Sequence, residues 1–232
     1  DVLIGKSILK NASILVAETE VGVDEYIGLD RTINRDEIVV LSPPFDTDEY
    51  IQLPKKGDFR KKYNILPSEK VVSFLGRVHY IKGNDFLIKG FAEFVKHDQH
   101  SRLVIIGPDD GHMTECKKIV IDLNIEDKVI FTGFLGGEYK NSALVDSDIV
   151  VQLSRQEQGA WAPLEAVLCE TPIVVTDHTG TGEDIKRMDA GYLVTFDDVI
   201  GLSNIFSTIF ANYDLAMNKT LKAKQYIEQH LS

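Results

Sequence analysis

Short apolar runs recur along the chain from residue 71 onward and alternate with stretches of helical periodicity. The runs predict strands at residues 71–75, 102–106, 128–132, 149–153, 172–176 and 192–196. The first helical stretch has an apolar stripe formed by Phe86, Leu87, Phe91, Phe94 and Val95. Strands that are apolar on both faces and separated by helices predict an α/β fold with a doubly wound parallel sheet. Such sheets bind ligands beyond the carboxyl ends of their strands.

The beginning of the chain has too few elements for a second sheet of this kind. Helical patterns cover residues 5–11 and 20–29, and strand patterns cover residues 13–17 and 37–42, before Pro43 and Pro44. The basic run at residues 54–63 predicts a solvated hinge helix, and a phospholipid-facing patch is the alternative. Two helical segments at residues 200–213 and 214–230 close the chain.

Composition narrows the classes of partner. The chain has 232 residues, a net charge of -11 and 44% hydrophobic residues, which suit one large or two modest globular domains. The acidity argues against a nucleic-acid partner because the long-range field repels polyanions. Cys116 and Cys169 lie far apart without metal-type spacing, which favours buried free thiols in a reducing cytoplasm. No apolar run is long enough to predict a membrane span.

The stretch at residues 154–166, SRQEQGAWAPLEA, has the strongest chemical signal. Glu157 follows a buried strand on a glycine-containing loop, and Glu165 stands just inside the helix that begins around Pro163. Unpaired amides and the positive end of the helix dipole favour a phosphate at such a loop. A solvated loop glutamate and a helix-terminal glutamate are the simpler interpretation of the two carboxylates alone. The two carboxylates taken together with the loop amides and the helix start predict a site for a nucleotide sugar.

This stretch resembles the E-x7-E motif of retaining glycosyltransferases with the GT-B fold, in particular glycosyltransferase family 4. The resemblance continues through LEAVLCETPIVVTD at residues 164–177, and it covers nearly the whole chain, best at residues 71–194. It implies that Glu157 contacts the donor sugar and that Glu165 holds the ribose hydroxyls. The family usually has Gly-Phe-Gly after the first Glu or one position on, whereas Gln158, Gly159, Ala160 and Trp161 stand here. We therefore expect a differently shaped amide cradle at residues 159–161.

A second motif lies after the first strand of the predicted sheet. Arg77 and Lys82 stand in the segment FLGRVHYIKG, which is similar to the family's GR-(x)n-KG signature. The resemblance implies that both cations bind the donor diphosphate, and their charge would offset the two glutamates. Glycines also follow the strands, and the expected donor site includes Gly76 and the pair Gly133 and Phe134.

The resemblance also implies an organisation and a reaction. Residues 1–52 are expected to be a remnant of an N-terminal Rossmann-like domain with its linker, and residues 53–232 the donor-binding domain of a longer protein. The expected reaction moves a sugar from a UDP- or GDP-linked donor to a glycan or lipid-linked acceptor, which binds mainly through the missing N-terminal domain. The isolated fragment is not expected to complete the transfer.

No further cofactor and no metal are expected. The Asp-x-Asp triplets at residues 46–48 and 146–148 are more simply explained by chance in an acidic chain. The expected location is the cytoplasm, and peripheral contact with the inner face of the membrane is a further possibility for the full-length protein. Two alternatives stay open: a catalytically degenerate GT-B module that binds nucleotide without transferring sugar, and a nucleotide-sugar epimerase on the same fold.

Overall fold

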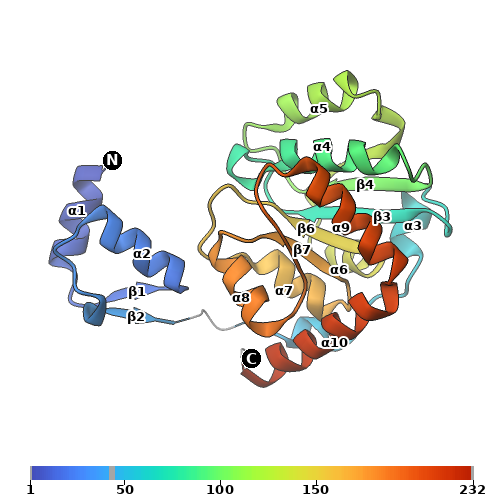
Figure 1. The fold of residues 1–232 in the computed structure, drawn as a ribbon. Helices are drawn as coiled ribbons and strands as arrows, with labels where there is room; N and C mark the ends of the chain where they lie inside the picture. The colour runs from blue at the N-terminus through green and yellow to red at the C-terminus, as the bar shows by residue number, and fades with distance from the viewer. Residues whose placement is uncertain (1, 42–44, 231–232) are drawn as a thin grey trace.

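The computed structural model describes residues 2–41 and 45–230, and its largest feature is a parallel sheet of six strands (Figure 1). The strand order is β5-β4-β3-β6-β7-β8. The strands are β3 (Lys70–Leu75), β4 (Ser101–Ile106), β5 (Val129–Gly133), β6 (Ile149–Gln152), β7 (Ile173–Thr176) and β8 (Tyr192–Val194). The predicted doubly wound α/β fold is confirmed. The chain builds outward from β3 to β5, then returns to β6 beside β3, so the switch in direction lies between these two central strands.

Helices cover both faces of this sheet (Figure 1). One face packs against α4 (Asn84–Val95), α5 (Met113–Asp122) and α9 (Val199–Ala211). The predicted apolar stripe of α4 is buried in this core, where each large side chain contributes about 1.5–3 kcal/mol. The helices of the other side are α3 (Asp58–Lys62), α6 (Glu138–Val145), α7 (Trp161–Leu168), α8 (Gly180–Met188) and α10 (Tyr213–His230).

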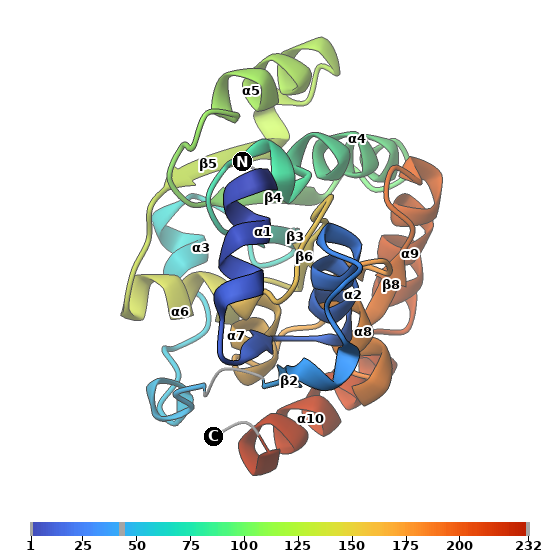
Figure 2. The same cartoon turned by 90° about the vertical axis from the view of Figure 1, so that its left-hand side faces the viewer.

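The N-terminal elements form a separate small unit (Figures 1 and 2). It contains α1 (Val2–Asn11), β1 (Leu15–Ala17), α2 (Glu20–Leu29) and β2 (Ile38–Val40), and β1 and β2 pair in parallel. Both strands are shorter than predicted, with three residues each. The predicted strand end at residue 42 and the prolines Pro43 and Pro44 lie outside the described residues.

Contacts join the N-terminal part of the chain to the larger domain at several points. Helix α2 packs beside α8, as seen in Figure 2. Phe45 and Tyr50 are buried in the core formed by α7, α8 and α10, although both precede residue 52, the expected domain boundary. The carboxyl ends of β3 and β6 therefore face a region that residues from both parts of the chain surround.

Candidate functional site

Lys82 and Glu157 meet at the switch between β3 and β6. Lys82 ends a single 3₁₀ turn, Tyr80–Lys82, and its ammonium forms an ion pair with Glu157. The two side chains are only 18% and 16% exposed, and the Ser154 hydroxyl donates to Glu157 Oε2 at 3.3 Å. The structure thus brings together the two residues that the sequence analysis assigned to the diphosphate and to the sugar. Their charges neutralise each other in a region largely shielded from water.

Gly83 explains how the two strand ends can approach so closely. Its φ is 66°, and a Cβ atom there would lie 1.9 Å from the carbonyl oxygen of Leu153. Only glycine fits both the left-handed backbone and this contact. The glycine that follows Lys82 therefore places the lysine against the loop that leaves β6.

Arg155 fixes the same loop from its other side. Its guanidinium binds Asp85 through two hydrogen bonds of 2.9 and 2.7 Å and lies 3.8 Å from the centre of the Tyr80 ring. Burial raises the pKa of Asp85, but the hydrogen bonds and charge of Arg155 outweigh burial and hold that pKa below its usual value. The sequence analysis did not identify the pair of Arg155 and Asp85. It ties α4, the turn before it and the Glu157 loop into one rigid edge.

Glu165 lies on α7, as predicted, and is held by a lysine that the sequence analysis missed. Lys140 of α6 places its Nζ 2.8 Å from Glu165 Oε1 and 3.1 Å from the Tyr50 hydroxyl. Burial, with the nearby charge of Glu165, raises the pKa of Tyr50, so its hydroxyl stays protonated. Lys140 stands alone in its helix and belongs to no motif, so only the tertiary structure reveals it.

The loop between the two glutamates has fewer open amides than expected. Helix α7 begins at Trp161, two residues before Pro163, because the backbone at Ala160 is extended and the proline needs no N–H partner in a first turn. The Ala160 amide donates to the Thr181 hydroxyl at 2.8 Å. This amide of the predicted cradle therefore faces α8. The start of α7 itself has no side-chain cap, which leaves the favourable end of its dipole for an anion.

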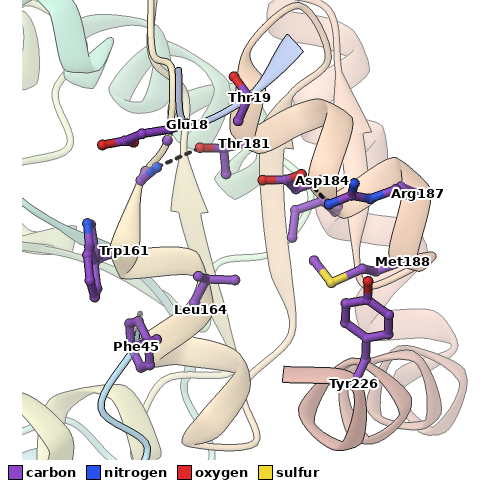
Figure 3. A pocket seen from close by; sticks show the side chains of 13 residues that line it. Glu18, Thr19, Phe45, Trp161, Leu164, Thr181, Asp184, Arg187, Met188 and Tyr226 are labelled. Carbon is purple, nitrogen blue, oxygen red and sulfur yellow. Dashed lines mark hydrogen bonds and ion pairs between the residues drawn. The ribbon is translucent and has the colours of Figure 1, made fainter. Parts of the chain in front are cut away.

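A small cavity of about 60 Å³ borders this loop on the side of α8 (Figure 3). Trp161 is 44% exposed and stacks on Phe45 at a centroid distance of 4.9 Å, forming an aromatic wall. Asp184 pairs with Arg187 at 2.8 Å across from it, and burial raises the pKa of Asp184. The remaining lining residues are Glu18, Thr19, Gly159, Ala160, Leu164, Thr181, Ile185, Met188 and Tyr226. None of the four predicted charged residues lines this cavity.

The other predicted residues lie at the same edge of the sheet without converging on Glu157. Arg77 follows β3 through Gly76 and is 63% exposed, with its guanidinium paired to Asp110. Gly133 ends β5, the edge strand, and Phe134 beyond it is 75% exposed. In the present conformation Arg77 and Phe134 present their side chains largely to solvent.

The aspartate triplets have structural partners. Asp146 accepts hydrogen bonds from the Gly57 and Arg60 amides, and Asp148 pairs with the Arg60 guanidinium at 2.9 Å. Asp46 closes a local turn by accepting from the Asp48 amide at 3.0 Å. Within residues 2–41 and 45–230, no three His, Cys, Asp or Glu residues group as metal ligands, and no helix is long and apolar enough to cross a membrane.

The two cysteines are buried free thiols, as predicted. Burial raises the pKa of both Cys116 and Cys169 to about 12. The thiolate, which is the nucleophilic form, is therefore scarce at neutral pH. Neither residue has the chemistry of a catalytic nucleophile.

Comparisons with known proteins identify the family of the chain. The family model of the glycosyl transferases group 1 matches residues 55–227. An uncharacterized glycosyltransferase of Methanocaldococcus jannaschii is 31% identical over 145 residues, which are 62% of this chain and 36% of that protein. Mannosylfructose-phosphate synthase of Agrobacterium fabrum is 29% identical over 182 residues, 75% of this chain and 39% of that protein. The chain thus spans less than half the length of these two relatives.

Solved structures match the fold. The structure of Anabaena HepE in complex with UDP-glucose has a TM-score of 0.88 at 20% identity, covering 99% of this chain and 63% of that one. Sucrose-phosphate synthase of Thermosynechococcus elongatus has a TM-score of 0.83 at 20% identity, covering all of this chain and 57% of that one. At such identities the likeness concerns the fold. The family match, which covers most of the chain, shows that it belongs to the glycosyl transferases group 1.

Proposed function

We propose that this chain is the donor-binding part of a retaining glycosyltransferase of family 4, a hexosyltransferase that uses a nucleotide sugar. The observation that carries the proposal is the shielded pair of Lys82 and Glu157 at the switch between β3 and β6. A parallel sheet binds ligands at this place. The pair offers a cation for a diphosphate and a carboxylate for sugar hydroxyls, and the two groups are in direct contact.

The proposed chemistry is electrostatic. As the bond between the sugar and the diphosphate breaks, negative charge grows on the leaving phosphate, and Lys82, Arg77 and the uncapped start of α7 would stabilise it. Lys82 would exchange its contact with Glu157 for the diphosphate, which frees Glu157 to orient the sugar. Arg77, exposed beside Asp110, would swing onto the diphosphate by side-chain rotation. No step in this scheme uses a metal ion or a further cofactor.

Glu165 would bind the ribose hydroxyls. Its ion pair with Lys140, whose ammonium also donates to the Tyr50 hydroxyl, would hold the carboxylate in one orientation before the nucleotide arrives. Gly76, Gly133 and Phe134 would line the nucleoside side of the site. Anabaena HepE has been solved with UDP-glucose, which supports a UDP-linked donor as the first one to test, before a GDP-linked one.

The acceptor and the setting are part of the same proposal. A glycan or a lipid-linked saccharide would bind through the remainder of the N-terminal domain, as in polysaccharide biosynthesis. The full-length protein would act in the cytoplasm or at the inner face of the membrane. Residues 1–52 would then be the last part of that N-terminal domain, and this chain alone would bind donor without transferring its sugar.

A degenerate, non-catalytic module is the second candidate. Its support is the Ala160 amide, which donates to Thr181 and so faces away from an anion. Isothermal titration with UDP, GDP, ADP and their sugars tests the main proposal. Binding of one diphosphate together with its sugar, followed by slow donor hydrolysis, is the expected result. Binding without any hydrolysis favours the degenerate module, and no binding to any of these compounds refutes both.

A further inference from the structure

We propose that Glu25 of helix α2 is a positioning residue for the loop that carries Glu157. Gln156 Nε2 donates to Glu25 Oε1 at 2.7 Å, and Gln158 Nε2 donates to Glu25 Oε2. One carboxylate of the N-terminal unit thus holds both neighbours of the residue that is to contact the sugar. The inference rests on the proposed function, because it assigns Glu25 a part in the binding of the donor sugar.

The contacts of successive residues explain how this clamp orients Glu157. Gln156 and Gln158 reach α2, whereas Glu157 between them reaches Lys82 on the larger domain. Fixing the two outer side chains on α2 therefore directs the middle one to the opposite side. The clamp uses neutral amide donors, so it introduces no second cation that would compete with Lys82 for Glu157.

Backbone contacts tighten the same loop from both sides. The Thr19 hydroxyl donates to the Gln158 carbonyl at 3.1 Å, and a Cβ atom at Gly22 would lie 3.0 Å from the Gln158 amide oxygen. On the side of the larger domain, the Gly180 amide donates to the Glu157 carbonyl at 2.9 Å. The loop therefore lies between α2 and α8 with little free space around Gln158.

This arrangement gives a physical reason for the unusual sequence after Glu157. The resemblance implied Gly-Phe-Gly after the first Glu or one position on, and neither glycine nor phenylalanine has a side chain that can donate a hydrogen bond to a carboxylate. Gln158 can, and Gln156 supplies the second donor. We infer that in this protein the N-terminal unit completes the sugar side of the donor site, while the diphosphate side belongs to the larger domain alone.

The test compares Glu25→Ala with Asp24→Ala. Asp24 is the neighbouring exposed acid on α2, and within the described part of the chain its carboxylate has no hydrogen bond or ion pair, so the control removes the same charge without touching the loop. Trp161 is the chain's one tryptophan and stands at the end of the loop, so its emission and its quenching by acrylamide report on loop order. Amide hydrogen exchange at residues 156–160 provides a second readout.

Binding is measured with UDP and with UDP-glucose, or with GDP and GDP-mannose where that pair binds the wild-type protein. Loss of hydrogen bonds to a charged group predicts that Glu25→Ala weakens binding of the nucleotide sugar about tenfold. Binding of the diphosphate alone should change less than about twofold, since its contacts do not involve the clamp. Glu25→Gln keeps one acceptor oxygen and should restore part of the loss. Asp24→Ala should match the wild type in every readout.

The outcomes separate this inference from the proposed function. Equal affinities of Glu25→Ala and wild-type protein for the nucleotide sugar overturn the inference, as do equal losses for the sugar and the diphosphate. Failure of the wild-type protein to bind any nucleotide overturns the proposed function and with it the role in sugar binding. In that case, if amide hydrogen exchange at residues 156–160 and acrylamide quenching of Trp161 are the same in Glu25→Ala as in the wild type, the proposal that Glu25 orders the loop is also overturned.

Discussion

Removal of the Lys82 ammonium tests the central ion pair of the site most directly. Lys82→Ala removes the ion-pair partner of Glu157, whose side chain is 16% exposed in the wild-type structure, and the Ser154 hydroxyl at 3.3 Å is then its remaining side-chain donor. The substitution also removes a cation that the proposed function assigns to the diphosphate. We therefore expect two separate losses, one in folding stability and one in nucleotide binding.

The partial burial of the pair sets the size of each loss. Exposed pairs contribute about 0–1 kcal/mol, and breaking a fully buried pair costs about 3–5 kcal/mol. Exposures of 18% and 16% place this pair between these limits. We expect the free energy of unfolding to fall by about 1–3 kcal/mol. Loss of a charge-assisted hydrogen bond should weaken diphosphate binding by about 1.5–3 kcal/mol, roughly ten- to 150-fold.

A double-mutant cycle with Glu157→Gln separates the two effects. In the wild type, Lys82 must break its ion pair with Glu157 to reach the diphosphate, which reduces the net contribution of the lysine to binding. In the Glu157→Gln background that cost is absent, so the same lysine change should weaken binding more, by about 0.5 kcal/mol or more. Chemical denaturation measures the stability, and isothermal titration measures binding to the nucleoside diphosphate.

The control is Lys62→Ala, which removes a surface lysine from α3. It should leave diphosphate affinity unchanged. Diphosphate affinity of Lys82→Ala equal to that of the wild type would remove the lysine from the donor site. Additive effects of the lysine and glutamate changes would show that the pair is not coupled in binding, and the electrostatic reasoning would then be wrong.

Three further predictions follow from the same structure. Glu165→Gln and Lys140→Ala should each weaken diphosphate and nucleotide sugar alike in titration calorimetry, because both act on the ribose side; a loss confined to the sugar would contradict this assignment. Gly83→Ala should lower the free energy of unfolding, measured by thermal denaturation, by about 3 kcal/mol or more, because it adds a backbone clash to a left-handed φ. The control Gly57→Ala, at a φ of 107° with open space around the Cβ position, should lower it by about 1–2 kcal/mol. The folded-state pKa of Asp85 is lowered, so the ionised carboxylate stabilises the fold above the unfolded pKa near 3.8, and this stabilisation is lost as the pH falls through the folded pKa. In acid titrations the free energy of unfolding of Asp85→Asn should therefore fall less than that of the wild type. An identical dependence on pH in both proteins would count against the pair of Asp85 and Arg155.

The sequence by itself determined the α/β fold and the position of most of its elements. Buried strands such as β4 and β7 are continuous apolar runs because helices cover both faces of the sheet. These runs can be recognised in the sequence without knowing which strands and helices pack against them. The motif that ends at Gly83 and the motif with the two glutamates also predicted a ligand site, which stays a prediction. These signals are local, so a single sequence contains them in full.

The tertiary structure decided which side chains meet. Lys82 and Glu157 are 75 positions apart, and Glu25 and Gln158 are 133 apart, so no spacing rule predicts either contact. Lys140 reaches Glu165 because α6 packs beside α7, a consequence of the strand order. Arg77 followed its strand as predicted yet points to Asp110, since a long exposed side chain takes whichever partner is near. Pairing between distant segments depends on packing in three dimensions, which periodicity and motifs along one chain do not specify.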